Sequence, residues 1–185
     1  MNKEYYEENL KVLKNFIKLD IVYKDILKNI IKCFEDNHKL IFMGNGGSAA
    51  DSNHIVSEFV AHFKLDRKGL PAISLTANNS LITAIGNDYS FDNIYEKQID
   101  AIGEKGDIVF GISTSGKSIN IIKALNKAQS KGIKSVLVTG ENTVKGIDCV
   151  VNIPSLDTSI IQNMYMIFFH MLCLDIDRYY YEYRN

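Results

Sequence analysis

The chain has 185 residues, of which 46% are hydrophobic, and this is the size and apolar content of one domain with a single core. Its 21 Lys and Arg residues and 22 Asp and Glu residues are spread along the sequence and leave a net charge of −1. This balance argues against a nucleic acid or an anionic membrane surface as a partner. Any bound phosphate must therefore be held by local groups.

The cysteines and the first residues of the chain indicate where it works. Cys33, Cys149 and Cys173 are far apart and lack CxxC spacing, so we predict three buried, reduced thiols and no zinc knuckle. Residues 1–9 are polar and acidic, and no apolar run approaches the roughly 18 residues that cross a bilayer. We expect a cytoplasmic protein that does not enter a membrane.

The order of the expected helices and strands predicts the fold class. Apolar residues recur at helical spacing from Asn2 to Asn37, and Asp20 lies between two such patterns, so two helices precede the first strand. Short β-rich runs then alternate with helical patterns; the runs lie at 40–43, 72–75, 108–111, 135–138 and 149–153. This alternation predicts an α/β fold, a three-layer doubly wound parallel sheet flanked by helices, in one domain over residues 1–185.

The last stretch, from Thr158 to Tyr183, is a long helical pattern that is apolar and aromatic on nearly all sides. Such a helix must be covered, and a second subunit could supply part of the cover. Together with the apolar N-terminal helices, it predicts a homo-oligomer, specifically a tetramer, because soluble monomers rarely expose large apolar patches.

A glycine-rich segment follows the first expected strand, and it reads Gly44-Asn45-Gly46-Gly47-Ser48. Glycines at a strand-to-helix turn let backbone N–H groups converge, and the start of the helix beyond them favours an anion. A tight turn without a ligand explains the segment equally well.

A serine-rich segment follows the third expected strand, at residues 111–118, and it reads GISTSGKS. It fits the nucleotide-binding P-loop pattern, which makes a P-loop NTPase the rival interpretation. Such enzymes also need a later strand ending in an acidic residue, and neither 135–138 nor 149–153 provides one. The hydroxyl groups of Ser113, Thr114, Ser115 and Ser118 suit a phosphate monoester better.

Two pairs of polar residues on expected helices could carry acid–base chemistry. His54 and Glu58 are four residues apart, so they lie one turn apart on one helix face and can share a ligand. Gln162 and His170 interrupt the apolar C-terminal helix, about 12 Å apart along its axis. The alternatives are an exposed surface pair for the first and a core histidine for the second. Asn87 and Asp88 could bind sugar hydroxyls or form only an Asx turn.

Taken in order, the motifs GNGGSxxDxxHxxxE, GND, GISTSGxS and IQxxxxxxxH resemble those of the sugar isomerase (SIS) fold, and specifically of the phosphoheptose isomerases. The resemblance covers residues 39–175. It implies conversion of sedoheptulose 7-phosphate, a phosphorylated seven-carbon sugar, into D-glycero-D-manno-heptose 7-phosphate. It also implies a place in the synthesis of activated heptose for bacterial surface glycans such as lipopolysaccharide or capsule. It implies Glu58 and His170 as acid and base, and one Zn²⁺ per subunit. The zinc ligands it implies are His54, Glu58, Gln162 and His170. The substrate-binding residues it implies are Asn45, Gly46, Gly47, Ser48, Glu58, Asn87, Asp88, Ser113, Thr114, Ser115, Ser118 and Gln162.

The same fold hosts a non-catalytic relative, a replication-initiator-associating protein, which lacks the acid–base set that Glu58 and His170 supply here. A regulatory sugar-phosphate-binding module therefore remains the alternative to an enzyme. The chain departs from the family pattern at His62, in place of Arg, at residues 159–160, in place of Asp-Arg, and at residues 163–165, Asn-Met-Tyr, in place of Glu-x-His.

Overall fold

The computed structural model describes residues 2–16 and 20–183, and the part of the expected N-terminal helices at 17–19 lies outside the described residues. Five parallel strands form one sheet in the order β2-β1-β3-β4-β5. The strands are β1 (Leu40–Gly44), β2 (Ala72–Ser74), β3 (Ile108–Ile112), β4 (Lys134–Thr139) and β5 (Cys149–Asn152). The doubly wound α/β sheet is confirmed, with strand bounds close to those expected.

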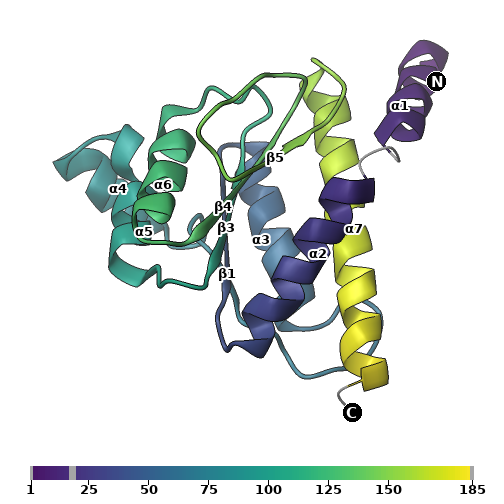
Figure 1. Cartoon of the computed structure of the whole chain (residues 1–185). Helices are drawn as coiled ribbons and strands as arrows, with labels where there is room; N and C mark the ends of the chain where they lie inside the picture. Colours follow the sequence, from purple (N-terminus) through teal and green to yellow (C-terminus); the bar gives the residue numbers. More distant parts are fainter. Residues whose placement is uncertain (1, 17–19, 184–185) are drawn as a thin grey trace.

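Helices cover both faces of the sheet (Figure 1). The helical elements are α1 (Lys3–Phe16), α2 (Asp20–Glu35), α3 (Gly47–Val60), α4 (Asn79–Asp88), η2 (Phe91–Asn93), α5 (Glu96–Ile102), α6 (Ile119–Ser130) and α7 (Thr158–Tyr183). α4, α5 and α6 lie on one side of the sheet, and α2, α3 and α7 lie on the other (Figure 1). As expected, Asp20 begins the second helix.

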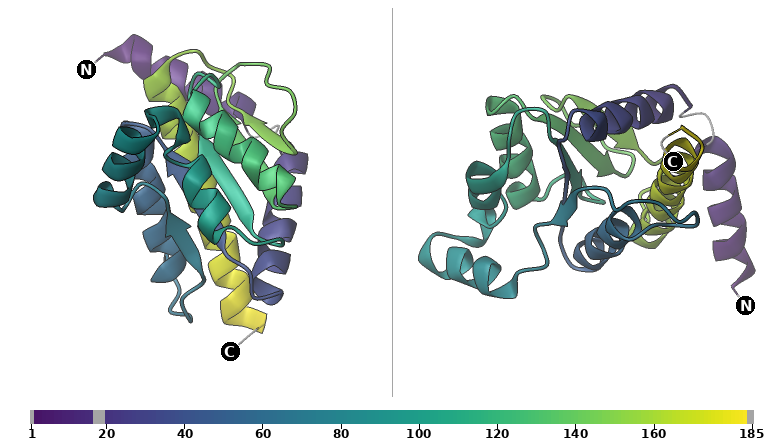
Figure 2. Two further views of the ribbon diagram at one scale, coloured as in Figure 1. Left: turned by 90° about the vertical axis from the view of Figure 1, so that its left-hand side faces the viewer. Right: turned by 90° about the horizontal axis from the view of Figure 1, so that it is seen from below.

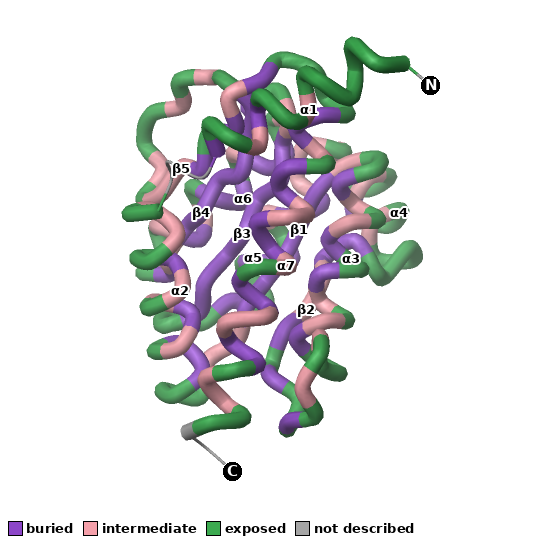
Figure 3. Tube along the Cα trace, turned by 90° about the vertical axis from the view of Figure 1, so that its right-hand side faces the viewer, coloured by how far each residue is buried: buried purple, intermediate pink, exposed green. Residues whose placement is uncertain are grey.

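Each strand feeds two cores because successive side chains point to opposite faces. In β1, Leu40 and Phe42 join the core under α2, α3 and α7, whereas Ile41 and Met43 join the core under α5 and α6. Buried residues follow the sheet and the inner sides of these helices (Figure 3). The sheet is thus a rigid, doubly covered platform for the loops at its carboxyl edge.

α1 lies on the far side of α7 from the sheet (Figure 2), and most of its residues are exposed. Val12 and Phe16 are buried, and Asn163 on α7 donates hydrogen bonds to Tyr5 and Asn9 on α1, at 3.1 and 2.9 Å. α1 therefore packs on the domain through one narrow face. Its other faces keep exposed apolar surface, such as Tyr6.

The expectation that no apolar run is long enough to cross a membrane is wrong for α7. From Thr158 to Glu182 it is long and apolar enough, by length and composition, to cross a membrane. Half of its most apolar stretch is buried inside the domain, and Phe168, Phe169 and Leu172 are core residues. Its apolar character thus suits packing on the sheet. The three cysteines are free thiols, two of them buried and Cys149 half-buried.

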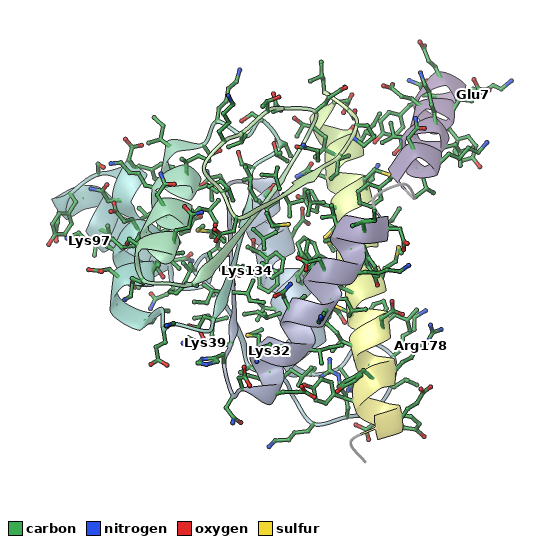
Figure 4. The ribbon with its side chains drawn as sticks, viewed as in Figure 1. Glu7, Lys32, Lys39, Lys97, Lys134 and Arg178 are labelled. Carbon is green, nitrogen blue, oxygen red and sulfur yellow. The ribbon has the colours of Figure 1, made fainter. Side chains whose placement is uncertain are left out.

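The labelled charged side chains lie on different elements, with Glu7 on α1, Lys97 on α5 and Arg178 on α7, and they are spread over the molecule (Figure 4). This distribution agrees with the balanced composition.

Candidate active site

The glycine-rich loop connects β1 to α3 and passes close to α7. Gly46 has a φ of 55°, which a residue with a side chain rarely adopts. A Cβ on Gly47 would lie 2.5 Å from Nε2 of Gln162, so the end of the Gln162 side chain lies against the start of α3. The segment is therefore more than a tight turn, since Gln162 from α7 lies beside the first turn of α3.

Asn45 joins the glycine-rich loop to α6, which follows the serine-rich loop. The side-chain amides of Asn45 and Asn120 exchange two hydrogen bonds of 2.9 Å each. Tyr95, from the same side of the sheet as α6, donates a hydrogen bond to the backbone oxygen of Gly44. Because β1 and β3 are neighbours in the sheet, these bonds fix the two loops side by side at its carboxyl edge.

The serine-rich loop keeps its hydroxyl groups close together. Ser113 is buried and donates a hydrogen bond of 2.9 Å to Ser118, which precedes the first turn of α6 and makes no side-chain capping bond there. The backbone N–H of Lys117 donates to Ser115. The N–H groups of the first turn of α6 thus lack a side-chain cap from Ser118, as in helix ends that bind phosphate.

The expected acid–base residues come together between α3 and α7. Nε2 of His54 lies 3.1 Å from Oε1 of Glu58, and the ring centroids of His54 and His170 are 5.5 Å apart. The pair on α3 therefore faces the histidine on α7. The alternative of an isolated surface pair does not describe this arrangement.

His170 is not a satisfied core histidine. Its Nε2 is the one buried side-chain nitrogen or oxygen without a hydrogen-bond partner in the described part of the chain. One face of the ring stacks on Phe63, with centroids 5.1 Å apart and planes 16° apart. Burial of the ring, followed by the nearby charge of His54, lowers the pKa of His170, and Glu58 opposes this effect. A neutral imidazole with a free nitrogen is the form that accepts a proton.

An open groove of about 640 Å³ runs between α3 and α7. Its lining residues are Gly47, Ala50, Asp51, Gln162, Asn163, Met166, Ile167 and His170. Gln162 and His170 therefore reach one groove although they are eight residues apart on α7. The groove begins at the glycine-rich loop, so a ligand anchored there would extend toward His170.

Asn87 and Asp88 are placed away from this groove within one chain. They are exposed at the end of α4, and Asn87 donates a hydrogen bond of 2.8 Å to Asp88. α4 belongs to the opposite side of the sheet from α3 and α7 (Figure 1). The structure therefore brings together most of the expected site residues but leaves this pair apart from the acid–base cluster.

The four expected zinc ligands are suited to a metal by their chemistry. Two imidazoles, a carboxylate and an amide are donors that zinc accepts, and the unpartnered Nε2 of His170 is a nitrogen that a metal would satisfy. Among the described residues, however, no three or more His, Cys, Asp or Glu side chains form a ready metal cluster. The set fits in composition, and the side chains would have to converge on binding.

A buried ion pair fixes the segment that follows α3. Nε of Arg67 lies 2.7 Å from Oδ1 of Asp177, and both side chains are almost fully buried. Oδ2 of Asp177 accepts hydrogen bonds from the backbone N–H groups of residues 63–65, and Arg67 donates to the backbone oxygens of Glu58 and Phe59. The end of α3 that carries Glu58 is thereby tied to α7, which carries His170.

Three contacts around the site were not expected from the sequence. They are the Asn45–Asn120 pair, the Arg67–Asp177 pair and a hydrogen bond that Tyr165 donates to Asp51. Asp51 is the aspartate of the first motif, and residue 165 is one of the departures from the family pattern, so both positions carried a signal. The other contacts join residues far apart in the chain and left no local pattern.

The SIS domain family model matches residues 4–140. A phosphoheptose isomerase of Thermodesulfovibrio yellowstonii is 43% identical over 92% of this chain and 87% of its own length, and a probable phosphoheptose isomerase of Thermoplasma volcanium is 43% identical over 96% and 91%. Among solved structures, phosphoheptose isomerases from Neisseria gonorrhoeae and Francisella tularensis superpose with TM-scores of 0.87 and 0.90, at 32% and 31% identity, each covering 95% of this chain and 96% of the other. The chain therefore belongs to the SIS domain family and, within it, to the phosphoheptose isomerases.

Proposed function

We propose that this protein is an aldose–ketose isomerase that converts sedoheptulose 7-phosphate into D-glycero-D-manno-heptose 7-phosphate. The observation that carries the proposal is the unpartnered, buried Nε2 of His170, a residue that lies beside the His54–Glu58 pair and lines a groove that begins at the glycine-rich loop. A proton-transfer site uses an imidazole nitrogen that has no other hydrogen-bond partner, whereas a binding module does not need one.

The reaction moves two protons and needs no external oxidant or reductant. A proton leaves C1 of the ketose while the oxygen on C2 gains one, which gives an enediol; C2 then takes up a proton as the oxygen on C1 loses its own, which leaves an aldehyde at C1. We assign the carbon-bound proton to His170, whose lowered pKa keeps the imidazole neutral, and the oxygen-bound proton to the carboxyl group of Glu58. Each group contributes on the order of 10²–10⁴ to the rate of such a reaction.

The two loops would hold the rest of the substrate. The hydroxyl and N–H groups of the serine-rich loop suit the phosphate, because they converge before the start of α6. The glycine-rich loop lies beside it through the Asn45–Asn120 pair and leads to the groove, so it suits the sugar chain. Asn87 and Asp88 would contribute to a site completed by a neighbouring subunit.

A zinc ion is part of the proposal as a bound cofactor. His54, Glu58, Gln162 and His170 would hold it, one ion per subunit. When bound, zinc supplies a positive charge that polarises oxygen atoms at the reacting carbons. Glu58 and His170 would still have to move protons, so each would act beside the metal or leave it during turnover.

We further propose a cytoplasmic homotetramer that feeds the synthesis of bacterial lipopolysaccharide or capsule. Support for an oligomer comes from exposed apolar side chains on α1, α3 and α7, which include Tyr6, Leu10, Val60 and Met171. Such surface is typical of subunit contacts.

A panel of five-, six- and seven-carbon ketose phosphates tests the proposed substrate. We expect product from sedoheptulose 7-phosphate and little from the shorter sugars. Sugar phosphate binding without turnover would favour the regulatory module instead. Binding of magnesium–ATP that is lost in Lys117→Ala would favour a P-loop NTPase.

A further inference from the structure

The hydroxyl group of Tyr165 is a meeting point of α3 and α7 beside the groove. Its Oη lies 2.5 Å from Oδ2 of Asp51 and 3.0 Å from Oγ of Ser48. The side-chain amide of Gln162 lies near the same hydroxyl and, as a donor would, opposes the rise that burial causes in the pKa of Tyr165. The ring of Tyr165 is fully buried, so core packing fixes the position of the hydroxyl.

The direction of these hydrogen bonds follows from the chemistry of the partners. A phenol has one proton and two lone pairs, whereas a carboxylate only accepts. The proton of Tyr165 therefore goes to Asp51, so the phenolic oxygen accepts from Ser48 and can accept from the amide of Gln162.

This direction determines how the amide of Gln162 is turned. Only the NH₂ group of an amide can donate, so Nε2 must face Tyr165 and the start of α3. A Cβ on Gly47 would lie 2.5 Å from Nε2 and 3.8 Å from Oε1, which is the same orientation. Because Gln162 lines the groove, its carbonyl oxygen is the amide atom left to meet a ligand there.

We propose that Tyr165 is a positioning residue that turns the carbonyl oxygen of Gln162 toward the groove, where this oxygen accepts a hydrogen bond from a hydroxyl group of the bound sugar. Without the phenolic oxygen, the amide can rotate and present NH₂ to the groove, and a donor facing a hydroxyl proton is a mismatch. The proposal rests on the proposed function, because the sugar is that enzyme's substrate.

The orientation of the amide can be measured without any activity. In ¹⁵N-edited NMR spectra, the side-chain NH₂ signals of Gln162 are those lost in Gln162→Ala. We expect Tyr165→Phe to shift these signals and to speed their exchange with water. The matched control is Tyr23→Phe, because Tyr23 donates a similar hydrogen bond of 2.6 Å to Asp175 on α7. Unchanged Gln162 signals in Tyr165→Phe would overturn the proposal.

Kinetics then test what the orientation does. We expect Tyr165→Phe to lower kcat/KM about tenfold, mainly by raising KM, because the lost contact is made to bound substrate before and during the reaction. In a Gln162→Ala background the same change should have little further effect, whereas a merely structural role would give additive losses. Tyr23→Phe should keep the wild-type KM.

The outcomes separate this inference from the proposed function. One informative result is an active wild-type protein with a Tyr165→Phe variant that keeps the wild-type KM, and another is an active wild-type protein with additive losses in the double variant. Either result would overturn the role of Tyr165 and leave the proposed function intact. A wild-type protein without isomerase activity would contradict the proposed function, and the amide spectra would still decide the orientation of Gln162.

Discussion

The imidazole rings of His54 and His170 meet edge to face, with centroids 5.5 Å apart and planes at 64°. One ring comes from α3 and the other from α7, and Glu58 bonds to the first. This contact joins the two helices at the proposed site of proton transfer.

His170→Gln separates a catalytic from a structural role. We expect turnover to fall at least about a hundredfold, because the side chain loses its proton acceptor, while the Tm changes little. His38→Gln is the control, since His38 lies at the other end of β1, near Asp107, and should leave turnover unchanged. If His170→Gln keeps the wild-type turnover but has a lowered Tm, His170 is a core histidine instead.

Glu58→Gln should reduce turnover to a similar extent, because the amide cannot take up and release a proton. Glu58 and His170 act on the same intermediate, so the double variant should lose much less than the product of the two single losses. Measured kcat/KM values for the three variants decide this. Fully multiplicative losses would show that the two residues act independently.

The Arg67–Asp177 pair should be among the largest contributors to stability. Asp177→Ala leaves the Arg67 charge buried and three backbone N–H groups without their acceptor, so we expect a loss of about 3–5 kcal/mol in the free energy of unfolding. The control is Asp25→Ala, which breaks the exposed Lys134–Asp25 pair and should cost less than about 1 kcal/mol. Equal losses in urea unfolding would contradict the prediction.

Metal removal tests the zinc proposal. Dialysis of the wild-type protein against a chelator should lower turnover, and added Zn²⁺ should restore it. The restored turnover should rise in proportion to the Zn²⁺ that the protein binds. His54→Ala removes one proposed ligand without removing Glu58 or His170, and it should weaken Zn²⁺ binding measured by calorimetry. Full activity of a protein shown to be free of metal would refute the requirement.

The proposed oligomer rests on the exposed apolar surface of α1 and α7. Light scattering should give a multiple of the subunit mass of 20.9 kDa, and four subunits are expected. Tyr6→Glu, on the exposed face of α1, should weaken the assembly, whereas Glu7→Gln should not. A mass equal to that of one subunit would contradict the proposal.

Local sequence patterns were enough to predict the sheet. The β-rich runs and the start of the second helix at Asp20 each depend on neighbouring residues, and each was found where expected. The long apolar pattern of α7 was assigned correctly as a helix. The expectation that no apolar run approaches the length of a membrane span was wrong, because Thr158–Glu182 meets that criterion by length and composition.

The site was only partly predictable, because several of its contacts join residues that are far apart in the chain. Motif order identified Glu58 and His170, but no local pattern could show that Tyr165 bonds to Ser48, 117 positions earlier, or that Asn45 pairs with Asn120. Such contacts depend on how α7 and α6 pack on the sheet. The position of Asn87 and Asp88, on the other side of the sheet, likewise depends on the path of the chain between β2 and β3.

The most direct test of the central claim is NMR of sedoheptulose 7-phosphate incubated with the protein in D₂O. Proton transfer through an enediol should give an aldose heptose phosphate with deuterium at C2, and both the product and the label should nearly vanish in Glu58→Gln and His170→Gln. Neither product nor deuterium incorporation by the wild-type protein would contradict the account.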